Sequence, residues 1–369
     1  MAVALFRERI QETINKRRMF RDLFTPWFIL KNSIELTCCS LFNKGFAAPV
    51  LHVDIKVTGK CNGNCSFCYS KNIKNSGKEL TTEDWKSFIN SFGKKKKLFY
   101  ITGGEPFLRK DIFKIIAAIK KQGSYCGIVT NGTLLPEKDL EKIIDLRVDN
   151  VVFSLHGLAE THNRILKIDN AFEKATKAIS ELNKLRKRSR RKTPYIMVNH
   201  VINASTKNEA NELIKLCMKL GADEIRFAHP SFLYHGELKK HSVISRERCD
   251  LEIKSSQHSK KINDIIFMND VLKRKLKIRV STYPNLSDGE IKEWYSKSFK
   301  TKRKCLYIYT SCFISETGDV YPCHFYSFSM GNIKKEKFDA IWNNKRSVEF
   351  RKIIRKSLLP GCSRCCKLF

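Results

Sequence analysis

The segment LHVDIKVTGKCNGNCSFC, residues 51–68, joins an alternating strand pattern to three closely spaced cysteines. Further β-type runs follow it, and amphipathic segments with helical spacing separate them. Strands that alternate with helices indicate parallel β/α units, and six units without a dinucleotide-binding glycine fingerprint favour a partial barrel over a Rossmann sheet. The sequence therefore predicts an α/β fold, a partial (β/α)6 TIM-like barrel. Its expected strands are residues 51–58, 97–104, 127–132, 150–157, 195–202 and 224–229.

The composition is that of a folded and strongly basic protein. Of 369 residues, 42% are hydrophobic and 29% are charged, which excludes disordered, collagen-like and coiled-coil classes. Lysine and arginine number 70 against 37 aspartates and glutamates, so the net charge is +33. A charge this large indicates a polyanionic partner, such as a phospholipid surface, an RNA or a phosphorylated substrate.

The composition and hydrophobic pattern of the sequence divide the chain into four parts. Residues 1–50 are a basic amphipathic segment, for which peripheral contact with an anionic membrane and packing against the barrel both remain open. Residues 51–235 form the barrel, 236–300 a helical connector, and 301–369 a small cysteine-rich hairpin–helix domain. No signal peptide and no membrane-spanning run is recognisable, so we expect a cytoplasmic protein with reduced thiols.

Three cysteines lie in the loop after the first expected strand. Cys61, Cys65 and Cys68 have the spacing C-x3-C-x2-C, so their thiolates can converge on one metal centre. Three protein ligands leave one coordination position free, which suggests chemistry at the metal. Zinc is the alternative, but structural zinc sites use four ligands, usually as two short pairs.

This loop resembles the defining motif of the radical S-adenosylmethionine (radical SAM) superfamily, with Phe67 at its aromatic position. The resemblance implies that the three cysteines hold a [4Fe-4S] cluster whose fourth iron binds S-adenosylmethionine. It also implies reductive cleavage of that molecule to a 5′-deoxyadenosyl radical, which abstracts hydrogen from a substrate. In such an enzyme the cofactors supply the difficult chemistry.

Glycines and polar residues at the ends of the expected strands match further positions of that family. The resemblance implies that these residues bind S-adenosylmethionine: Gly103, Gly104 and Glu105 of a GGEP turn at the amino group, Asn131 of a TNG turn near the ribose, Ser154 and Arg164 at the carboxylate, and Asn199 at a further polar position. Each of the last three also has an ordinary structural interpretation, as a turn hydroxyl, a surface arginine and a satisfied strand-end amide.

The sequence departs from many peptide-modifying relatives at one position. Those proteins carry an aspartate two residues after the serine, and this chain has His156. An imidazole there can be a catalytic proton acceptor that changes charge near neutral pH. The alternative is a structural histidine with a fixed tautomer. The absence of the aspartate counts against sulfatase-maturase chemistry.

A second group of cysteines lies near the C-terminus, in a pattern that resembles the SPASM and twitch extensions of radical SAM enzymes. The resemblance implies one auxiliary [4Fe-4S] cluster, because the chain has no further cysteines after the terminal group. A structural zinc site has the same spacing and stays open. The expected ligands are Cys305, Cys323, Cys362 and Cys365, with Cys312 as a competing or additional ligand.

Together these patterns predict a radical SAM enzyme whose auxiliary cluster assists substrate oxidation or binding. We expect an unidentified substrate, a peptide, sugar or lipid-linked precursor, and a one-electron reductant such as flavodoxin or ferredoxin in an anaerobic or low-oxygen setting. The alternatives are a peptide or protein maturase, an RNA-modifying enzyme, and a non-catalytic iron–sulfur or zinc protein. No nucleic-acid-binding module is recognisable, which counts against RNA.

Overall fold

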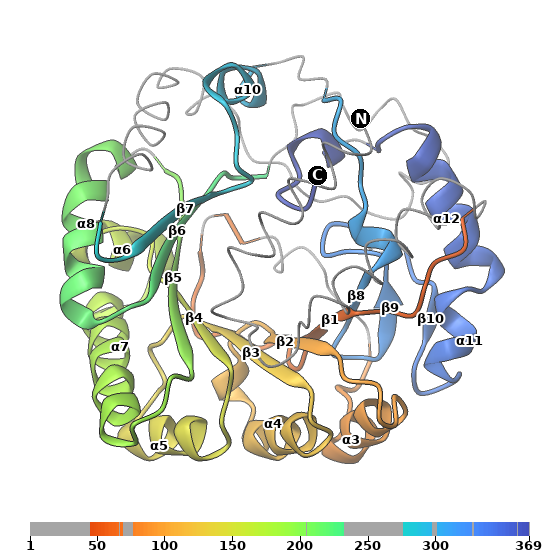
Figure 1. Ribbon diagram of the computed structural model, residues 1–369, viewed down its shortest axis with the longest axis horizontal. Helices are drawn as coiled ribbons and strands as arrows, with labels where there is room; N and C mark the ends of the chain where they lie inside the picture. The colour runs from red at the N-terminus through yellow and green to blue at the C-terminus, as the bar shows by residue number, and fades with distance from the viewer. Residues whose placement is uncertain are drawn as a thin grey trace.

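The computed structural model describes residues 45–65, 67–68, 77–203, 205–231, 276–296, 301–326, 328–359 and 361–368. The expected basic N-terminal segment therefore lies almost wholly outside the described residues, as does most of the expected connector. Within these ranges a curved sheet forms the centre of the molecule, and helices cover its outer side (Figure 1).

The sheet has ten strands in the order β10-β9-β8-β1-β2-β3-β4-β5-β6-β7. The predicted partial barrel is confirmed, because the six expected strands correspond to β1 to β6 and pair in parallel with their neighbours in chain order. The strands are β1 (His52–Lys56), β2 (Leu98–Thr102), β3 (Tyr125–Thr130), β4 (Asn150–Ser154), β5 (Tyr195–Val201), β6 (Glu224–Ala228), β7 (Arg279–Tyr283), β8 (Ser311–Ile314), β9 (Asp319–Tyr321) and β10 (Gly331–Asn332).

The helices follow the strands as the β/α pattern requires. Helix α3 begins at a capping box, in which Thr81 and Asp84 satisfy each other's backbone N–H groups. Its buried face carries Trp85, Phe88 and Ile89. The helices are α3 (Thr82–Asn90), α4 (Ile112–Lys121), α5 (Glu137–Asp145), α6 (Ala159–Leu166), α7 (Ala171–Arg188), α8 (Thr206–Leu220), α10 (Asp288–Trp294), α11 (Phe338–Trp342) and α12 (Lys345–Lys356), with short 3-10 turns η2 (Pro106–Leu108), η6 (Tyr307–Tyr309) and η7 (Cys362–Arg364).

The region expected to be a helical connector contributes a strand. In its described part, strand β7 pairs in parallel with β6 and extends the barrel, and helix α10 follows. Strand β7 is as long as β1, β2, β4 and β6, but the sequence of residues 236–300 around it is highly charged and only weakly periodic.

The cysteine-rich C-terminal part also joins the barrel sheet. Strand β8 pairs in parallel with β1, and an antiparallel hairpin then leads to β9 and β10. The hairpin turn is fixed to the first strand by a buried ion pair between Lys56 Nζ and Glu316 Oε1 at 3.1 Å. The C-terminal part is thus built onto the open side of the barrel.

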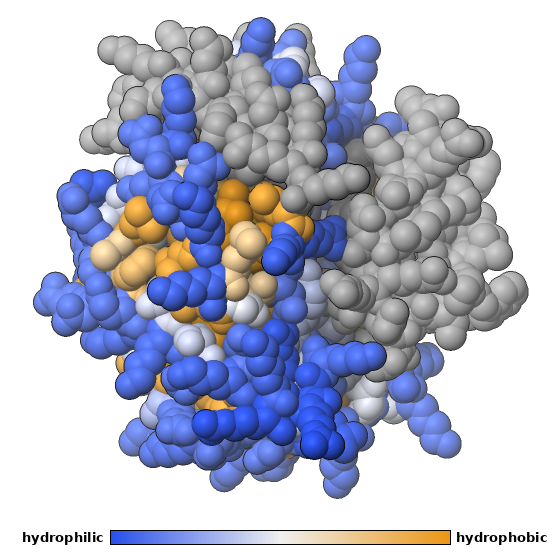
Figure 2. Space-filling model, turned by 60° about the vertical axis from the view of Figure 1, so that its left-hand side comes forward, coloured by the Kyte–Doolittle hydropathy of each residue, from blue (hydrophilic) through white to orange (hydrophobic). Residues whose placement is uncertain are grey.

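One hydrophobic core lies between the outer face of the sheet and the helices. Strand residues such as Ile55, Ile101 and Phe153 face it, and alternate residues face the barrel interior. Hydrophilic side chains dominate the face shown in Figure 2, with one hydrophobic area in its upper part. Among the described helices, none is long and apolar enough to cross a membrane.

Candidate active site

The three-cysteine loop leaves the C-terminal end of β1. Cys61 is exposed, and its Sγ accepts a hydrogen bond from the backbone N–H of Gly63 at 3.3 Å. The N–H of Asn64 donates to the carbonyl oxygen of Leu166 at 2.8 Å, which fixes the loop to the end of α6. An amide N–H directed at a cysteine sulfur is the kind of contact that tunes iron–sulfur clusters.

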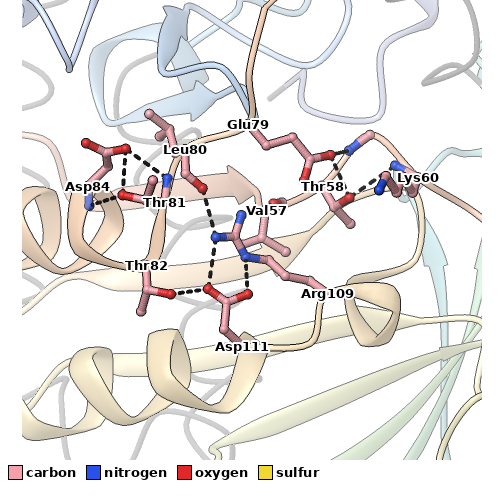
Figure 3. A network of polar contacts seen from close by, with 11 residues as sticks. Val57, Thr58, Lys60, Glu79, Leu80, Thr81, Thr82, Asp84, Arg109 and Asp111 are labelled. Atoms are coloured by element: carbon pink, nitrogen blue, oxygen red, sulfur yellow. Dashed lines mark hydrogen bonds and ion pairs between the residues drawn. The ribbon is translucent and has the colours of Figure 1, made fainter.

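Both flanks of the loop are held by a clamp centred on Arg109 (Figure 3). Its Nη1 donates to the carbonyl of Val57 at 2.7 Å and its Nη2 to that of Leu80 at 2.8 Å. Asp111 orients the guanidinium through a 2.9 Å contact from Nε to Oδ1. Because Val57 precedes the loop and Leu80 follows it, one side chain fixes where the loop starts and where the chain returns.

A carboxylate beside this clamp orders the first residues of the loop (Figure 3). Glu79 Oε1 accepts hydrogen bonds from the Thr58 hydroxyl at 2.8 Å and from the Gly59 N–H at 2.9 Å. The backbone before Cys61 is therefore fixed by side chains from the returning segment.

The expected GGEP turn packs directly against the loop. The N–H of Gly104 donates to the carbonyl of Thr58 at 2.8 Å, and the N–H of Glu105 to that of Lys60 at 2.8 Å. A Cβ atom on Gly104 would lie 2.0 Å from the carbonyl oxygen of Lys60 and 2.8 Å from Cys61 Cβ. Glycine is required here because two backbone segments pass without room for a side chain.

The carboxylate of Glu105 is buried and accepts hydrogen bonds from within the protein. Its side chain is 1% exposed, and its two oxygens accept from the Thr130 hydroxyl, from the Asn131 N–H, both at 2.8 Å, and from the Phe107 N–H at 3.2 Å. The carboxylate therefore joins the ends of β2 and β3 under the turn. Contact of Glu105 with the amino group of S-adenosylmethionine stays a prediction.

Glu105 should make stability depend on pH. Burial raises its pKa to about 7, despite hydrogen bonds from Asn131, Thr130 and Phe107 that lower it. Between the unfolded pKa near 4.5 and about 7, the folded state binds more protons than the unfolded state, so this group's contribution declines as pH rises. Relative to Glu105→Gln, wild type should lose about 2 kcal/mol between pH 5.5 and pH 8. Urea unfolding at both pH values measures this, and parallel pH profiles would contradict it.

Asn131 connects the TNG turn to the cysteine loop. Its Nδ2 donates to Asn62 Oδ1 at 2.8 Å, and its Oδ1 accepts from the N–H and hydroxyl of Thr133 at 2.9 and 2.7 Å. The described structure thus uses this side chain to hold the loop beside β3. Contact with a ribose remains a proposal.

Two of the expected strand-end residues lie side by side, and the third does not join them. Ser154 at the end of β4 is in register with Asn199 on β5, so both side chains lie on one face of the sheet. The Arg164 side chain is 65% exposed on α6 and pairs with Glu160 at 3.6 Å, one helical turn away. The expectation that Arg164 pairs with a carboxylate beside Ser154 is therefore not supported; the surface-arginine interpretation fits.

His156 is a buried neutral imidazole. Its Nδ1 accepts the backbone N–H of Val201 at 3.2 Å, and its ring meets that of Phe67 edge-on at 4.8 Å. Burial, followed by the charges of His200 and His162, holds the pKa of His156 well below its usual range. This direction does not support a charge change near neutral pH at His156. The structural alternative fits, with His156 as the support against which the aromatic residue of the cysteine loop packs.

Four of the five expected C-terminal thiols form one group. Burial raises the pKa of Cys305 to about 11, and burial together with the charges of Cys305 and Cys323 raises that of Cys362 well above its usual value. The thiol of Cys365 interacts with Cys366 and with Cys362 and Cys305. A buried cluster of thiols is costly to ionise without a metal, so this donor set fits a metal centre.

Arg364 fixes the terminal C-x2-C turn of this group. It is fully buried, and it donates from Nε to the carbonyl of Trp294 at 2.8 Å and from Nη2 to that of Ser296 at 2.7 Å. These acceptors lie at the end of α10, where helical carbonyls lack intrahelical partners. The thiols of η7 are therefore positioned by the helix that follows β7.

Cys312 lies apart from this group. It is a fully buried residue of β8, in register with Val53 and part of the hydrophobic core. Burial raises its pKa strongly. The structure does not support the expectation that Cys312 is an additional ligand, because its position on the strand turns it toward the helices.

This placement predicts different outcomes for two cysteine variants. Cys312→Ala should retain the full iron content and lose about 1 kcal/mol of stability through a small core cavity. Cys362→Ala should lose about four irons per chain. Iron and sulfide analysis after anaerobic reconstitution, with urea unfolding of both variants, measures this; loss of iron from Cys312→Ala would return it to the ligand set.

The residues that fit two metal centres are thus three thiols in the loop after β1 and four near η7. Among the described residues, no three His, Cys, Asp or Glu side chains are already gathered around a metal-sized site. The donor chemistry is nevertheless that of iron–sulfur ligation, since thiolate is its usual ligand.

A parallel β/α barrel with thiol groups at these two places is typical of an iron–sulfur enzyme built on a β/α barrel. The chain belongs to the radical SAM superfamily, because the model of that family matches residues 55–241, and a model described as an iron-sulfur cluster-binding domain, SPASM, matches residues 305–366. It is a radical SAM enzyme that uses a [4Fe-4S] cluster and S-adenosylmethionine to generate a 5′-deoxyadenosyl radical, and its C-terminal part binds auxiliary iron–sulfur.

Relatives of differing activity resemble this chain. It is 28% identical to an AdoMet-dependent heme synthase of Methanosarcina barkeri over 84% of this chain and 86% of that protein. It is 25% identical to a PqqA peptide cyclase of Bradyrhizobium diazoefficiens over 76% of this chain and 67% of that protein. The crystal structure of Streptococcus suis SuiB bound to precursor peptide SuiA has the same fold, with a TM-score of 0.62, 16% identity and coverage of 94% and 79%.

A polar network that was not predicted from the sequence joins the barrel to the C-terminal thiols. The buried carboxylate of Asp54 on β1 accepts from Tyr307, from His52 Nε2 at 3.0 Å and from His324 Nε2 at 2.7 Å. Burial alone would raise the pKa of Asp54, but the charges and hydrogen bonds of the two histidines outweigh it and hold that pKa well below its usual range. His324 directly follows Cys323. The alternating polar residues of HVDIK were the available signal.

Proposed function

We propose that the protein oxidises its substrate by removal of a hydrogen atom and then an electron, with one auxiliary cluster beside the substrate. The observation that carries this is the position of the C-terminal thiols. Cys366, next to Cys365, interacts electrostatically with Arg226 on β6, whose side chain faces the barrel interior. Substrate in that interior would therefore lie between the two thiol groups.

When bound, the cluster after β1 supplies one electron to S-adenosylmethionine, and the auxiliary cluster accepts one electron from the substrate. The chain's own residues provide the positions. The Arg109 clamp fixes the loop of the three cysteines. Ser154 and Asn199, on the neighbouring strands β4 and β5, provide polar groups for S-adenosylmethionine. Cys305, Cys323, Cys362 and Cys365 hold the auxiliary cluster.

The electron balance requires an external one-electron carrier of the flavodoxin or ferredoxin class. It reduces the first cluster and reoxidises the auxiliary cluster. Two features favour docking of such a carrier: Cys61 is exposed at the surface, and the chain has a net charge of +33.

The test begins with the wild-type protein reconstituted anaerobically. We expect about eight irons per chain, and 5′-deoxyadenosine on addition of dithionite and S-adenosylmethionine. About four irons with product formed would leave the C-terminal thiols to zinc or to no metal. An intact cluster that forms no 5′-deoxyadenosine would contradict the proposed function.

A peptide maturase is the second candidate. The resemblance to a PqqA peptide cyclase favours it. Candidate precursor peptides incubated with enzyme, reductant and S-adenosylmethionine would show a loss of two hydrogens by mass spectrometry. An unchanged peptide mass, with 5′-deoxyadenosine still formed, would favour a non-peptide substrate.

A further inference from the structure

A row of polar side chains crosses the interior face of the barrel. Ser154 is in register with Asn199, Asn199 with Arg226, and Arg226 with Ser281. Residues in register on parallel strands share one face of the sheet, and the alternate residues of these strands pack with the helices in the core. The row therefore runs from the expected S-adenosylmethionine residues to β6 and β7.

The residues of this row are partly accessible to solvent. The Arg226 side chain is 24% exposed, and Ser154, Asn199 and Ser281 are partly exposed as well. Two residues earlier on β6, on the same face, Glu224 is only 3% exposed. The centre of a filled barrel would bury this whole row. A molecule entering the barrel would thus reach Arg226.

Positive charge exceeds negative charge around Arg226. Glu224 lies 3.4 Å from Arg226 Nη2 and 3.7 Å from Arg279 Nε, so one carboxylate faces two guanidinium groups. Its oxygens also accept from the Ser281 hydroxyl at 2.7 Å and the Tyr195 hydroxyl at 3.1 Å. The long contact with Glu224 engages one of the five N–H donors of Arg226.

A lysine from the C-terminal segment faces the same region. Lys367 Nζ lies 5.0 Å from the centre of the Tyr307 ring, and the Arg226 guanidinium lies 5.2 Å from the centre of the Tyr283 ring. Both cations interact electrostatically with Tyr283 and with Tyr100.

The carboxylate that interacts with this lysine is already engaged. Lys367 also interacts electrostatically with Asp54, but that carboxylate accepts from His52, His324 and Tyr307. Glu224 and Asp54 are thus the carboxylates that interact with Arg226, Arg279 and Lys367, and the thiols of Cys365 and Cys366 also interact with Lys367.

We propose that Arg226 and Lys367 together bind an anionic group of the substrate, a carboxylate or a phosphate, inside the barrel. The planar guanidinium offers parallel donors that match either group, and the ammonium adds a point charge. This inference rests on the proposed function, because it assigns the substrate to the space between the two thiol groups. An anionic group held there orients the rest of the substrate along the polar row toward Ser154.

The test uses small anions as probes, since the substrate is unidentified. Reconstituted protein saturated with S-adenosylmethionine and without reductant is titrated with inorganic phosphate and, separately, with propionate by calorimetry. We expect one saturable site per chain, weakened at least about tenfold in Arg226→Gln, or about 1.4 kcal/mol, and several-fold in Lys367→Gln. Arg226→Lys keeps the positive charge but lacks the parallel N–H donors of the guanidinium, so its affinity for the anion should lie between those of wild type and Arg226→Gln. Tighter phosphate binding indicates a phosphorylated substrate, and tighter propionate binding a carboxylate.

The exposed Lys215→Gln is the matched control for loss of one surface charge, and it should bind as wild type does. Iron content and thermal unfolding show whether each variant has folded. Absence of saturable binding in wild type, equal binding by folded Arg226→Gln, or binding that S-adenosylmethionine abolishes would overturn the inference. Formation of 5′-deoxyadenosine by wild type tests the proposed function separately, so an enzyme that cleaves S-adenosylmethionine but binds neither anion refutes only the anion site.

Discussion

Replacing Gly104 by alanine should lower the rate of 5′-deoxyadenosine formation by at least about 100-fold, because misplacement of a reacting group by about 1 Å costs that much. The new Cβ would lie 2.0 Å from the carbonyl oxygen of Lys60 and 2.4 Å from its carbonyl carbon. Neither backbone can yield easily, since Gly104 and Glu105 donate hydrogen bonds to Thr58 and Lys60 at 2.8 Å. The displacement therefore falls on Cys61, the first cysteine of the loop.

Gly289→Ala is the matched control for this variant. Its new Cβ would meet no atom within 4 Å, and its position in α10 suits alanine. The rate and the iron content should both remain at the wild-type level. Anaerobic product analysis by chromatography, with iron determined on the same samples, compares the two variants. Wild-type turnover by Gly104→Ala would show that the loop is not held as tightly as its contacts indicate.

Cys65→Ala should abolish 5′-deoxyadenosine formation, a loss of at least about 1,000-fold, and remove about four irons per chain. Two thiolates cannot hold the cluster that donates the electron. The loop itself should stay folded, because alanine at position 65 keeps the backbone contacts from Asn64 N–H to Leu166 O at 2.8 Å and from Cys68 N–H to Cys65 O at 3.3 Å.

A second thiol variant distinguishes loss of a ligand from loss of a thiol. Cys312→Ala removes a sulfur from the core and should keep both the iron and the product. Electron paramagnetic resonance of the reduced proteins adds an independent reading, since Cys65→Ala should retain only the auxiliary signal. Product formation by Cys65→Ala at a tenth of the wild-type rate or more would contradict the assignment of the loop.

The parts of the fold that repeat were predictable from the sequence. Strands β1 to β6 alternate with amphipathic helices, and each occurs at the expected residues. Strands β7 and β8 were not predictable as barrel strands, because each pairs with a strand far away in the chain. Pairing of that kind leaves no local period in the sequence.

The candidate site shows the same division between local and distant information. Spacing identified the loop of Cys61, Cys65 and Cys68, and it grouped the C-terminal thiols. Spacing also suggested Cys312 as a ligand, but this residue lies in a buried strand as part of the hydrophobic core. Arg164 and Glu105 were assigned by their place in a motif. Their actual partners, Glu160 on a helix surface and Thr130 on the next strand, depend on geometry that the motif does not encode.

The parallel pairing of β1 with β8 has a consequence for synthesis of the protein. The ion pair beside this pairing joins Lys56 to Glu316, residues 260 positions apart. At about 5 to 20 residues per second, a ribosome needs roughly 10 to 50 s to make the intervening chain. During that time one edge of the first strand has no partner, and an unpaired strand edge is a template for aggregation. A nascent chain halted before residue 311 should therefore bind chaperones more strongly than the completed protein does.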